Sequence, residues 1–363
     1  MIKRSSCVIC DNRDLELIIS CSKFPIMAIS NNEILDQFFD LTIIACTRCR
    51  CVQLQNLIDI EVLYSNIYMN STFSPSWADH HSVFSKFILN NTDDVSFLEI
   101  GANKGDLYKS MVKEKRVNFT VLDMFKHDDL PSEIQFVEGN CEEFNFNGFK
   151  TIILSHVFEH LYSLNTFIKN IQSCGVLSVF ISIPDFDLLL KEKSIIMLHS
   201  QHTFYCGIDY INYIFSLYNY RCENYFSYNG NFKSTMIKYV LDYSSEKLLL
   251  PSTNLQLIKE LYIDKVAYLN NFEIPMNTYI APAGIYGQYI YYFLNNKDNI
   301  LGFLDNNKER HGKYLYGTNK LVYSPLNIDY NASTVLLCNC PYKDEIVLGL
   351  KNICPSVRFI IIN

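Results

Sequence analysis

Four cysteines near the start of the chain have the spacing of a metal site. Cys7 and Cys10 form one CxxC pair, and Cys46 and Cys49 form a second. Four thiolates suit the tetrahedral coordination of Zn²⁺, and four protein ligands leave no open position for chemistry. The sequence therefore predicts a structural zinc ion, with a small subdomain between the pairs. Free thiols are the alternative, and Cys51 could compete as a ligand.

A second stretch, SFLEIGANKGD at 96–106, has the composition of a ligand-binding turn. Its apolar start predicts a buried parallel strand. Gly101 and Gly105 allow the backbone to approach a ligand, and the residues that follow can open a helix facing that ligand. The next predicted strand ends in Asp123, about 20 residues after the glycines, where a carboxylate can bind ribose hydroxyls. An ordinary βαβ unit without a ligand is the alternative.

Histidines follow the later strands of the same pattern. His156, Glu159 and His160 come at the end of the fourth predicted strand, and His199 and His202 follow the fifth. Because α/β sheets bind ligands beyond the carboxyl ends of their strands, we expect these residues near the ligand. The HxxxH spacing of His156 and His160 could suggest a metal, but the sequence offers no evident third ligand.

Composition narrows the class of protein. The 363 residues carry a net charge of −7 without a long run of Lys and Arg, which argues against a nucleic-acid partner. No apolar run reaches the roughly 18 residues that a membrane span needs, and the N-terminus lacks the apolar segment of a signal peptide. Thirteen cysteines in such a chain favour metal binding over disulfides. We expect a cytoplasmic monomer without a membrane partner.

The succession of predicted elements indicates an α/β protein with more than one domain. The expected divisions are a cysteine module with an acceptor-facing segment at 1–75, an α/β domain at 76–245, a helical linker at 246–276 and a second α/β domain at 277–363. In the last of these, Gly284 and Asp305 resemble a Rossmann turn and its acidic partner. The GxGxxG spacing is absent, so we expect no dinucleotide there.

Taken together, the motifs resemble the three-domain sugar C-methyltransferases of deoxysugar biosynthesis, which use S-adenosylmethionine (SAM). Four separated stretches carry the resemblance in the family's order. They are CTRCRCVQL (46–54), similar to the family's CxxCGxVQ with Arg50 in place of Gly; IYMNST (67–72), loosely similar to a Tyr-x-Tyr-x-Ser-Ser segment; EIGANKG (99–105), which matches the SAM loop; and LDNNKERHGKYLYGTNKLVYSP (304–325), similar to the C-terminal signature with Arg310 in the place of Lys.

This resemblance implies a class I SAM-dependent methyltransferase fold, with an N-terminal zinc module and a smaller C-terminal Rossmann-like domain. It implies that SAM is bound by Glu99, Gly101, Ala102, Asn103, Gly105, Asp123, Met124, Asn140, Cys141, His156 and His160. The acceptor, a nucleotide-linked sugar, is expected between the methyltransferase domain and the other two. Its expected contacts are Tyr68, Ser71, Lys308 and Lys313.

The family's catalytic histidine lies in a Tyr-x-Glu-His segment after the fifth strand. Here HSQH (199–202) stands at that place: His202 keeps the histidine, Gln201 replaces Glu and His199 replaces Tyr. The resemblance implies that His202 is the general base, with His199 as its competitor and Tyr68 as a hydrogen-bonding partner of the acceptor. Gln201 cannot take up a proton at neutral pH and carries no charge, so it cannot shift the pKa of His202 as a Glu would.

SAM carries an electrophilic methyl group, which a carbon accepts only after becoming nucleophilic. A carbon next to a ketone does so by losing a proton to a base, with donors facing the enolate oxygen. C-methylation of a keto nucleotide sugar is therefore the leading hypothesis, and O-methylation of a sugar or sugar-derived group is the alternative. A zinc-bearing RNA methyltransferase and a non-catalytic nucleotide-sugar binding protein are weaker alternatives from other classes.

Overall fold

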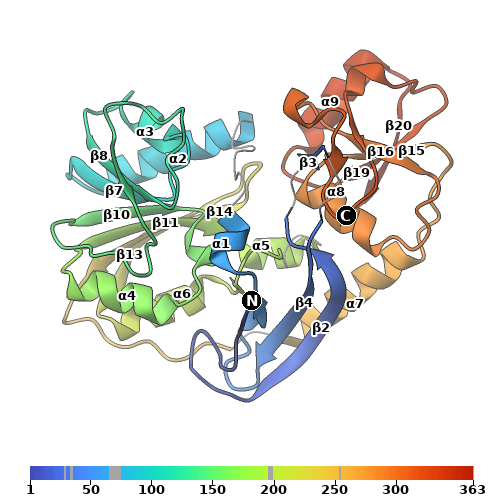
Figure 1. The fold of residues 1–363 in the computed structure, drawn as a ribbon. Helices are drawn as coiled ribbons and strands as arrows, with labels where there is room; N and C mark the ends of the chain where they lie inside the picture. Colours follow the sequence, from blue (N-terminus) through green and yellow to red (C-terminus); the bar gives the residue numbers. More distant parts are fainter. Residues whose placement is uncertain (28–29, 33–35, 65–74, 195–198, 253–254, 363) are drawn as a thin grey trace.

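The computed structural model describes residues 1–27, 30–32, 36–64, 75–194, 199–252 and 255–362 (Figure 1). Two α/β units stand on either side of a smaller antiparallel sheet formed mainly by the N-terminal segment. The predicted acceptor residues Tyr68 and Ser71 lie outside the described residues.

The first α/β unit is built on a sheet of seven strands in the order β13-β14-β11-β10-β7-β8-β9. Its strands are β7 (Ser96–Ile100), β8 (Asn118–Asp123), β9 (Gln135–Glu138), β10 (Thr151–Ser155), β11 (Ser178–Pro184), β13 (Tyr220–Tyr228) and β14 (Ser234–Leu241). The five strands from β9 to β11 are parallel, while β14 runs antiparallel to both β11 and β13. This arrangement confirms the class I methyltransferase fold, including its closing antiparallel pair.

Helices cover both faces of this sheet (Figure 1). On one face lie α2 (Pro75–Asn90) and α3 (Asp106–Met111), and on the other lie α4 (Leu164–Ser173) and α6 (Ile208–Leu217). The central strands are therefore buried on both sides, which explains their near-continuous apolar sequences. No residues were assigned from the sequence to β9, the third strand, whose exposed and half-buried residues give a weak signal.

The N-terminal segment forms a four-stranded antiparallel sheet in the order β12-β5-β4-β2. Its strands are β2 (Leu15–Pro25), β4 (Phe38–Cys46), β5 (Val52–Leu54) and β12 (Phe204–Tyr205). The chain returns to this sheet at β12, directly after the histidine segment 199–202. Short additional elements are β1 (Ile2–Lys3), paired with β6 (Asn56–Leu57), and the helices α1 (Ile60–Tyr64) and α5 (Phe186–Lys191).

The second α/β unit has five parallel strands in the order β18-β16-β15-β19-β20. They are β15 (Thr278–Ala281), β16 (Ile300–Leu304), β18 (Val322–Tyr323), β19 (Thr334–Cys338) and β20 (Arg358–Ile362), with the helices α8 (Ile285–Phe293) and α9 (Lys343–Ile353). The long helix α7 (Leu255–Asn270) precedes this sheet.

The antiparallel sheet is joined to the second unit by a common core. Phe24 of β2 contacts Tyr289 and Tyr292 of α8, with ring centroids 4.9 and 4.6 Å apart. In addition, β3 (Ser30–Asn31) pairs with β17 (Tyr314–Leu315). The N-terminal module therefore bridges the two α/β units rather than forming an appendage of one of them (Figure 1). In the described part of the chain, no helix is both long and apolar enough to cross a bilayer.

Candidate active site

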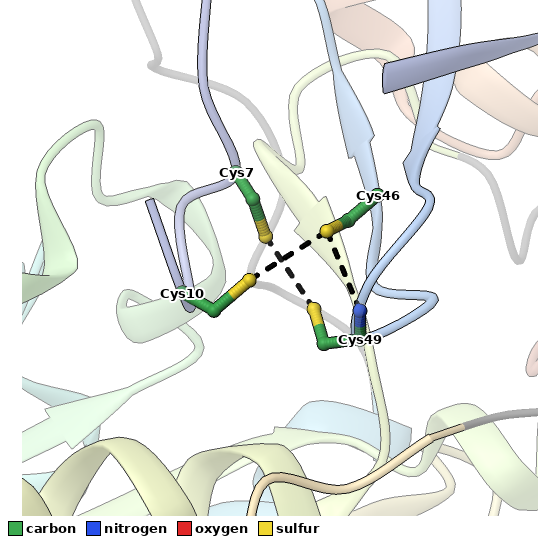
Figure 2. A group of neighbouring side chains, drawn as sticks. All are labelled: Cys7, Cys10, Cys46 and Cys49. Carbon is green, nitrogen blue, oxygen red and sulfur yellow. Dashed lines mark hydrogen bonds between the residues drawn. The ribbon is translucent and has the colours of Figure 1, made fainter. Parts of the chain in front are cut away.

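Four cysteine side chains meet at one point of the N-terminal module (Figure 2). The sulfur atoms of Cys7, Cys10, Cys46 and Cys49 all lie within 4.8 Å of one another, and none of these residues forms a disulfide. The Cys7–Cys49 and Cys10–Cys46 sulfur distances are 3.5 and 3.6 Å. A tetrahedron with arms of about 2.3 Å has edges of about 3.8 Å, so the cluster fits one Zn²⁺. The thiol of Cys51 instead donates to the carbonyl of Val52.

The cysteine cluster is tied to the segment that carries the histidines. The hydroxyl of Tyr210 donates to the carbonyl of Cys49 at 2.5 Å. The guanidinium of Arg4 donates to the carbonyls of Tyr162 and Thr203, and the amide of Leu54 also donates to Thr203. Because Thr203 follows His202 directly, the position of the histidine segment depends on the N-terminal module.

A large cavity lies between the carboxyl ends of the strands of the two α/β units. Its volume is about 1370 Å³. From the first unit it is lined by the residues that follow β7, β8, β10 and β11, and from the second by the start of α8 and the residues that follow β19. The carboxyl ends of parallel strands are the usual location of ligand sites in such sheets. The cavity is therefore the candidate active site.

Most of the predicted site residues line this one cavity. They are Glu99, Gly101, Ala102, Asn103, Asp123, Met124, Asn140, Cys141, His156 and His160 for the cofactor, and His199, Gln201 and His202 for catalysis. Gly105 is not part of the lining; it adopts a φ of 70° immediately before α3. Lys308 and Lys313 also lie outside the lining, on the second unit.

The turn after β7 leaves polar atoms without partners. Glu99 is buried, its Oε2 atom has no hydrogen-bond partner among the described residues, and the same holds for Oδ1 of Asn103. Burial, together with the nearby carboxylates of Asp123 and Asp106, raises the pKa of Glu99 to about 8. A buried polar atom without a partner is costly. A cationic ligand with its own donors would remove this cost.

Asp123 lies at the end of the neighbouring strand and faces the same turn. The amides of Met124 and Asn103 donate to its two carboxylate oxygens at 2.7 and 3.4 Å. Burial raises the pKa of this carboxyl, and the backbone donors act against that rise. Backbone donors hold the carboxylate in place while its remaining lone pairs can accept from hydroxyl groups.

Six histidines line the cavity, and four of them, His156, His160, His199 and His202, follow β10 and β11. His202 stacks on His199 with ring centroids 4.3 Å apart, and it meets His160 edge-on at 4.9 Å. The amide of Gln201 donates to Nδ1 of His199 at 3.1 Å, so the neutral His199 ring carries its proton on Nε2. Burial lowers the pKa of His160, His199 and His202, which keeps these rings neutral at pH 7.

The fourth imidazole, His156, connects two parts of the site. Its backbone has a φ of 53°, unusual for a residue with a side chain. Its Nδ1 lies 3.1 Å from Oε1 of Glu159, and its Nε2 lies 3.1 Å from Oγ of Ser234. A strained backbone that directs a polar side chain into a cavity is typical of functional sites.

Residues of the second α/β unit complete the cavity, and sequence reasoning did not identify them. They are Ile285, Tyr286, Asn339, Cys340, Pro341, Tyr342, Lys343 and Asp344. Tyr342 contacts Phe232 of the first unit, with ring centroids 5.4 Å apart. The signal was available: the segment 339–344 follows a predicted strand, at the edge where parallel sheets bind ligands. Lys193 and Lys265 also line the cavity.

The glycine turn of the second unit differs from the first. Arg310, only 8% exposed, donates to the carbonyl of Ala283 at 2.7 Å and pairs with Asp305 at 3.3 Å. A Cβ atom on Gly284 would lie 2.9 Å from Nη1 of Arg310. The guanidinium therefore occupies the space directly over this turn.

Neither a protein-family model nor a curated protein matches the sequence. Solved structures that are similar to it include a chain of the Haloferax volcanii complex of a methyltransferase activator with a protein described as a methyltransferase (9% identity, 46% of this chain, 92% of that chain, TM-score 0.37). Another is magnesium protoporphyrin IX methyltransferase of Synechocystis PCC 6803 with bound SAH (12% identity, 48% of this chain, 90% of that chain, TM-score 0.37). A third is human N-acetylserotonin methyltransferase with SAM (16% identity, 46% of this chain, 53% of that chain, TM-score 0.37). Each likeness covers less than half of this chain and is too distant to bear on activity.

Proposed function

We propose that the protein is a SAM-dependent methyltransferase that binds SAM over the turn after β7. The observation that carries this proposal is the pair of buried, unpartnered polar atoms on Glu99 and Asn103, which face a large cavity at the carboxyl edge of a methyltransferase-type sheet. The amino-acid end of SAM is zwitterionic, and its ammonium group suits the buried carboxylate of Glu99. Asp123, held by backbone amides, suits the ribose hydroxyls.

The acceptor is proposed to occupy the part of the cavity that the second α/β unit closes. Tyr286 and Tyr342 supply aromatic surface, and Lys193, Lys265 and Lys343 supply positive charge. This combination suits a nucleotide-linked sugar, in which a stacked base and a diphosphate accompany the reacting ring. Of the residues of the second unit, Tyr286, Tyr342 and Lys343 line the cavity and are better placed for the acceptor. Lys308 and Lys313 lie outside the lining.

The chemistry that we propose is methylation of a carbon next to a keto group. Neutral His202 takes the proton from that carbon, and the electrons of the C–H bond form the enolate. His199, protonated on Nε2, can donate to the developing oxyanion. The enolate carbon then forms a bond to the methyl group while the methyl–sulfur bond breaks, and its electron pair stays on sulfur. O-methylation, the alternative reaction, needs the same base acting on a hydroxyl.

The test of this mechanism is His202→Asn, with His311→Asn as the matched control outside the cavity lining. His202→Asn should retain SAM affinity by calorimetry and lose about 10²–10⁴-fold in turnover, which is the usual contribution of a positioned base. A panel of keto nucleotide sugars serves as acceptors. If His202→Asn turns over at a rate near that of the control, His202 is not the base, and His199 is the next residue to substitute.

Two product measurements separate the candidate reactions. Exchange of the acceptor's carbon-bound proton with solvent deuterium in the absence of SAM supports the enolate. A methyl group found on oxygen in the product would establish O-methylation and eliminate the carbon reaction, without affecting the proposed SAM site. If calorimetry detects no SAM binding at all, the methyltransferase proposal itself fails.

We further propose that the four-cysteine cluster binds one structural Zn²⁺. Metal analysis of protein purified without chelator should find zinc, and Cys46→Ser should lose one equivalent and destabilise the fold. Cys174→Ser, a half-buried cysteine outside the cluster, is the control. Because Thr203 is held by the N-terminal module, Cys46→Ser should also lower turnover. Unchanged metal content in Cys46→Ser, or a disulfide within the cluster, would contradict the assignment.

A further inference from the structure

A second group of metal-ligand side chains lies in the cavity itself. Glu159, His160 and His202 each present one ligand atom, and these atoms all lie within 4.8 Å of one another. Glu159 and His160 belong to the short 3₁₀ helix Phe158–His160 after β10, and His202 precedes β12. Residues 42 positions apart in the chain therefore meet at the cavity, which all three line.

The carboxylate of Glu159 is buried and has one oxygen atom without a hydrogen-bond partner among the described residues. Glu159 is 4% exposed. Its Oε1 atom is engaged by Nδ1 of His156 at 3.1 Å, while Oε2 has no hydrogen-bond partner in the described part of the chain. A buried carboxylate oxygen without a donor is unfavourable, and coordination to a cation would satisfy it.

The imidazoles are oriented in the manner of metal ligands. Nδ1 of His160 lies 3.1 Å from the carbonyl oxygen of Gln201. A carbonyl only accepts, so Nδ1 carries the proton and Nε2 keeps its lone pair. Metal-binding histidines almost always donate their other N–H in this way. His202 is fixed between the stacked ring of His199 and the edge of His160.

We propose that Glu159, His160 and His202 bind one divalent transition-metal ion, distinct from the zinc of the four-cysteine cluster. Two imidazoles and one carboxylate suit Zn²⁺, Co²⁺ or Mn²⁺ better than Ca²⁺, which prefers oxygen ligands alone. Three protein ligands leave coordination positions open toward the cavity. The ion takes the lone pair of the imidazole assigned above as the base, so metal binding inhibits methyl transfer reversibly. This last consequence rests on the proposed function, whereas binding of the ion does not.

The experiment is a titration of Co²⁺ into protein that carries a single equivalent of zinc, in the four-cysteine cluster, so that the second site is free at the start. A further equivalent should bind and produce visible d–d absorption without the thiolate-to-metal charge transfer of a cysteine site. Glu159→Gln and His160→Gln should each weaken this binding by more than about 100-fold, because even outer-shell changes cost 10–100-fold. His311→Gln is the matched control, and thermal unfolding of each variant reports on folding.

Absence of the further equivalent, or equal affinity in the variants and the control, overturns the site. Methyl-transfer assays give the second readout: added Co²⁺ should lower turnover, and a chelator should restore it. If the ion instead raises turnover in wild-type protein but not in Glu159→Gln, the inhibition is refuted and His202 is a ligand rather than the base. Loss of SAM binding affects the methyltransferase proposal alone, because the titration requires no SAM.

Discussion

The protein contains two strand–glycine–helix turns of similar construction, and their polar groups are satisfied in opposite ways. In the first, Glu99 and Asn103 keep buried oxygens without partners beside Gly101. In the second, Arg310 lies over Gly284, bonds Ala283 and pairs with the acidic residue at the end of the next strand. The first turn thus leaves side-chain oxygens without donors, while in the second a side chain of the same chain donates to the turn.

This difference explains how one sheet type can serve two purposes in the same molecule. A buried carboxyl group without a hydrogen-bond partner is unfavourable in the free protein, and a cationic ligand can stabilise its ionised form on binding. A turn whose carboxylate is already paired gains nothing from such a ligand. The first turn is therefore suited to binding a cofactor, and the second to stabilising the unit that closes the cavity.

Removal of the internal donor at the second turn should have the largest effect. Arg310→Ala leaves Asp305 buried without its cation, which should lower the free energy of unfolding by about 3–5 kcal/mol. Lys351→Ala, an exposed change on α9, should stay within about 0.5 kcal/mol of wild type. Chemical denaturation measures both. SAM affinity of the folded Arg310→Ala variant should remain unchanged.

A loss below 1 kcal/mol in Arg310→Ala would mean that Asp305 finds other partners or carries a proton, since burial alone raises its pKa. A fall in SAM affinity would show that the two turns are not independent. Either result would break the contrast between them.

The next prediction compares the acidic residues of the two turns directly. Asp123→Ala should weaken SAM binding by about 1.5–3 kcal/mol, the value of hydrogen bonds to a charged group. Asp305→Ala should leave SAM affinity unchanged but reduce stability, because it leaves Arg310 unpaired. Calorimetry and denaturation on both variants provide the comparison. Equal SAM affinities in the two variants would refute the assignment of Asp123 to the ribose.

The sequence predicted the fold of the first unit well because its strands are buried on both faces. The apolar runs that became β7, β8, β10 and β11 are visible without a structure, as is the antiparallel pair β13 and β14. The four cysteines and the cavity residues around Gly101 were also predictable, since glycines, thiols and strand-end carboxylates have specific chemical uses.

Contacts between distant segments could not be predicted in the same way. No periodicity indicated that β12 would join the N-terminal sheet, or that His202 would lie beside Glu159 and His160. The HxxxH spacing of His156 and His160 offered no evident third metal ligand in the sequence. In the structure it is His202, not His156, that groups with Glu159 and His160, while His156 is engaged by Ser234 and Glu159. The position of Arg310 over Gly284 could not be predicted from the sequence either, because the sequence showed only that Arg310 stands at the Lys position of a motif.

The last prediction concerns the protonation of Glu99 and is the smallest in energy. Its pKa is raised to about 8, so at pH 7 the free protein carries this side chain mainly in its neutral form. The ammonium of SAM favours the ionised form. Binding should therefore release about one proton at pH 7, and affinity should rise with pH until about pH 8 and then level off.

Calorimetry in two buffers of different ionisation enthalpy measures this proton directly. Glu99→Gln keeps the shape of the side chain but cannot titrate, so SAM binding to this variant should release no proton and its SAM affinity should not rise between pH 6 and pH 8.

In the absence of SAM, the contribution of Glu99 to the free energy of unfolding changes with pH in the opposite direction. A carboxyl whose pKa is raised by folding stabilises the native state most below its unfolded pKa, and this contribution is lost as pH rises toward 8. Glu99→Gln should flatten that decline. An identical proton release in wild type and variant would place the titrating group elsewhere, and the first turn would then lose the feature that distinguishes it from the second.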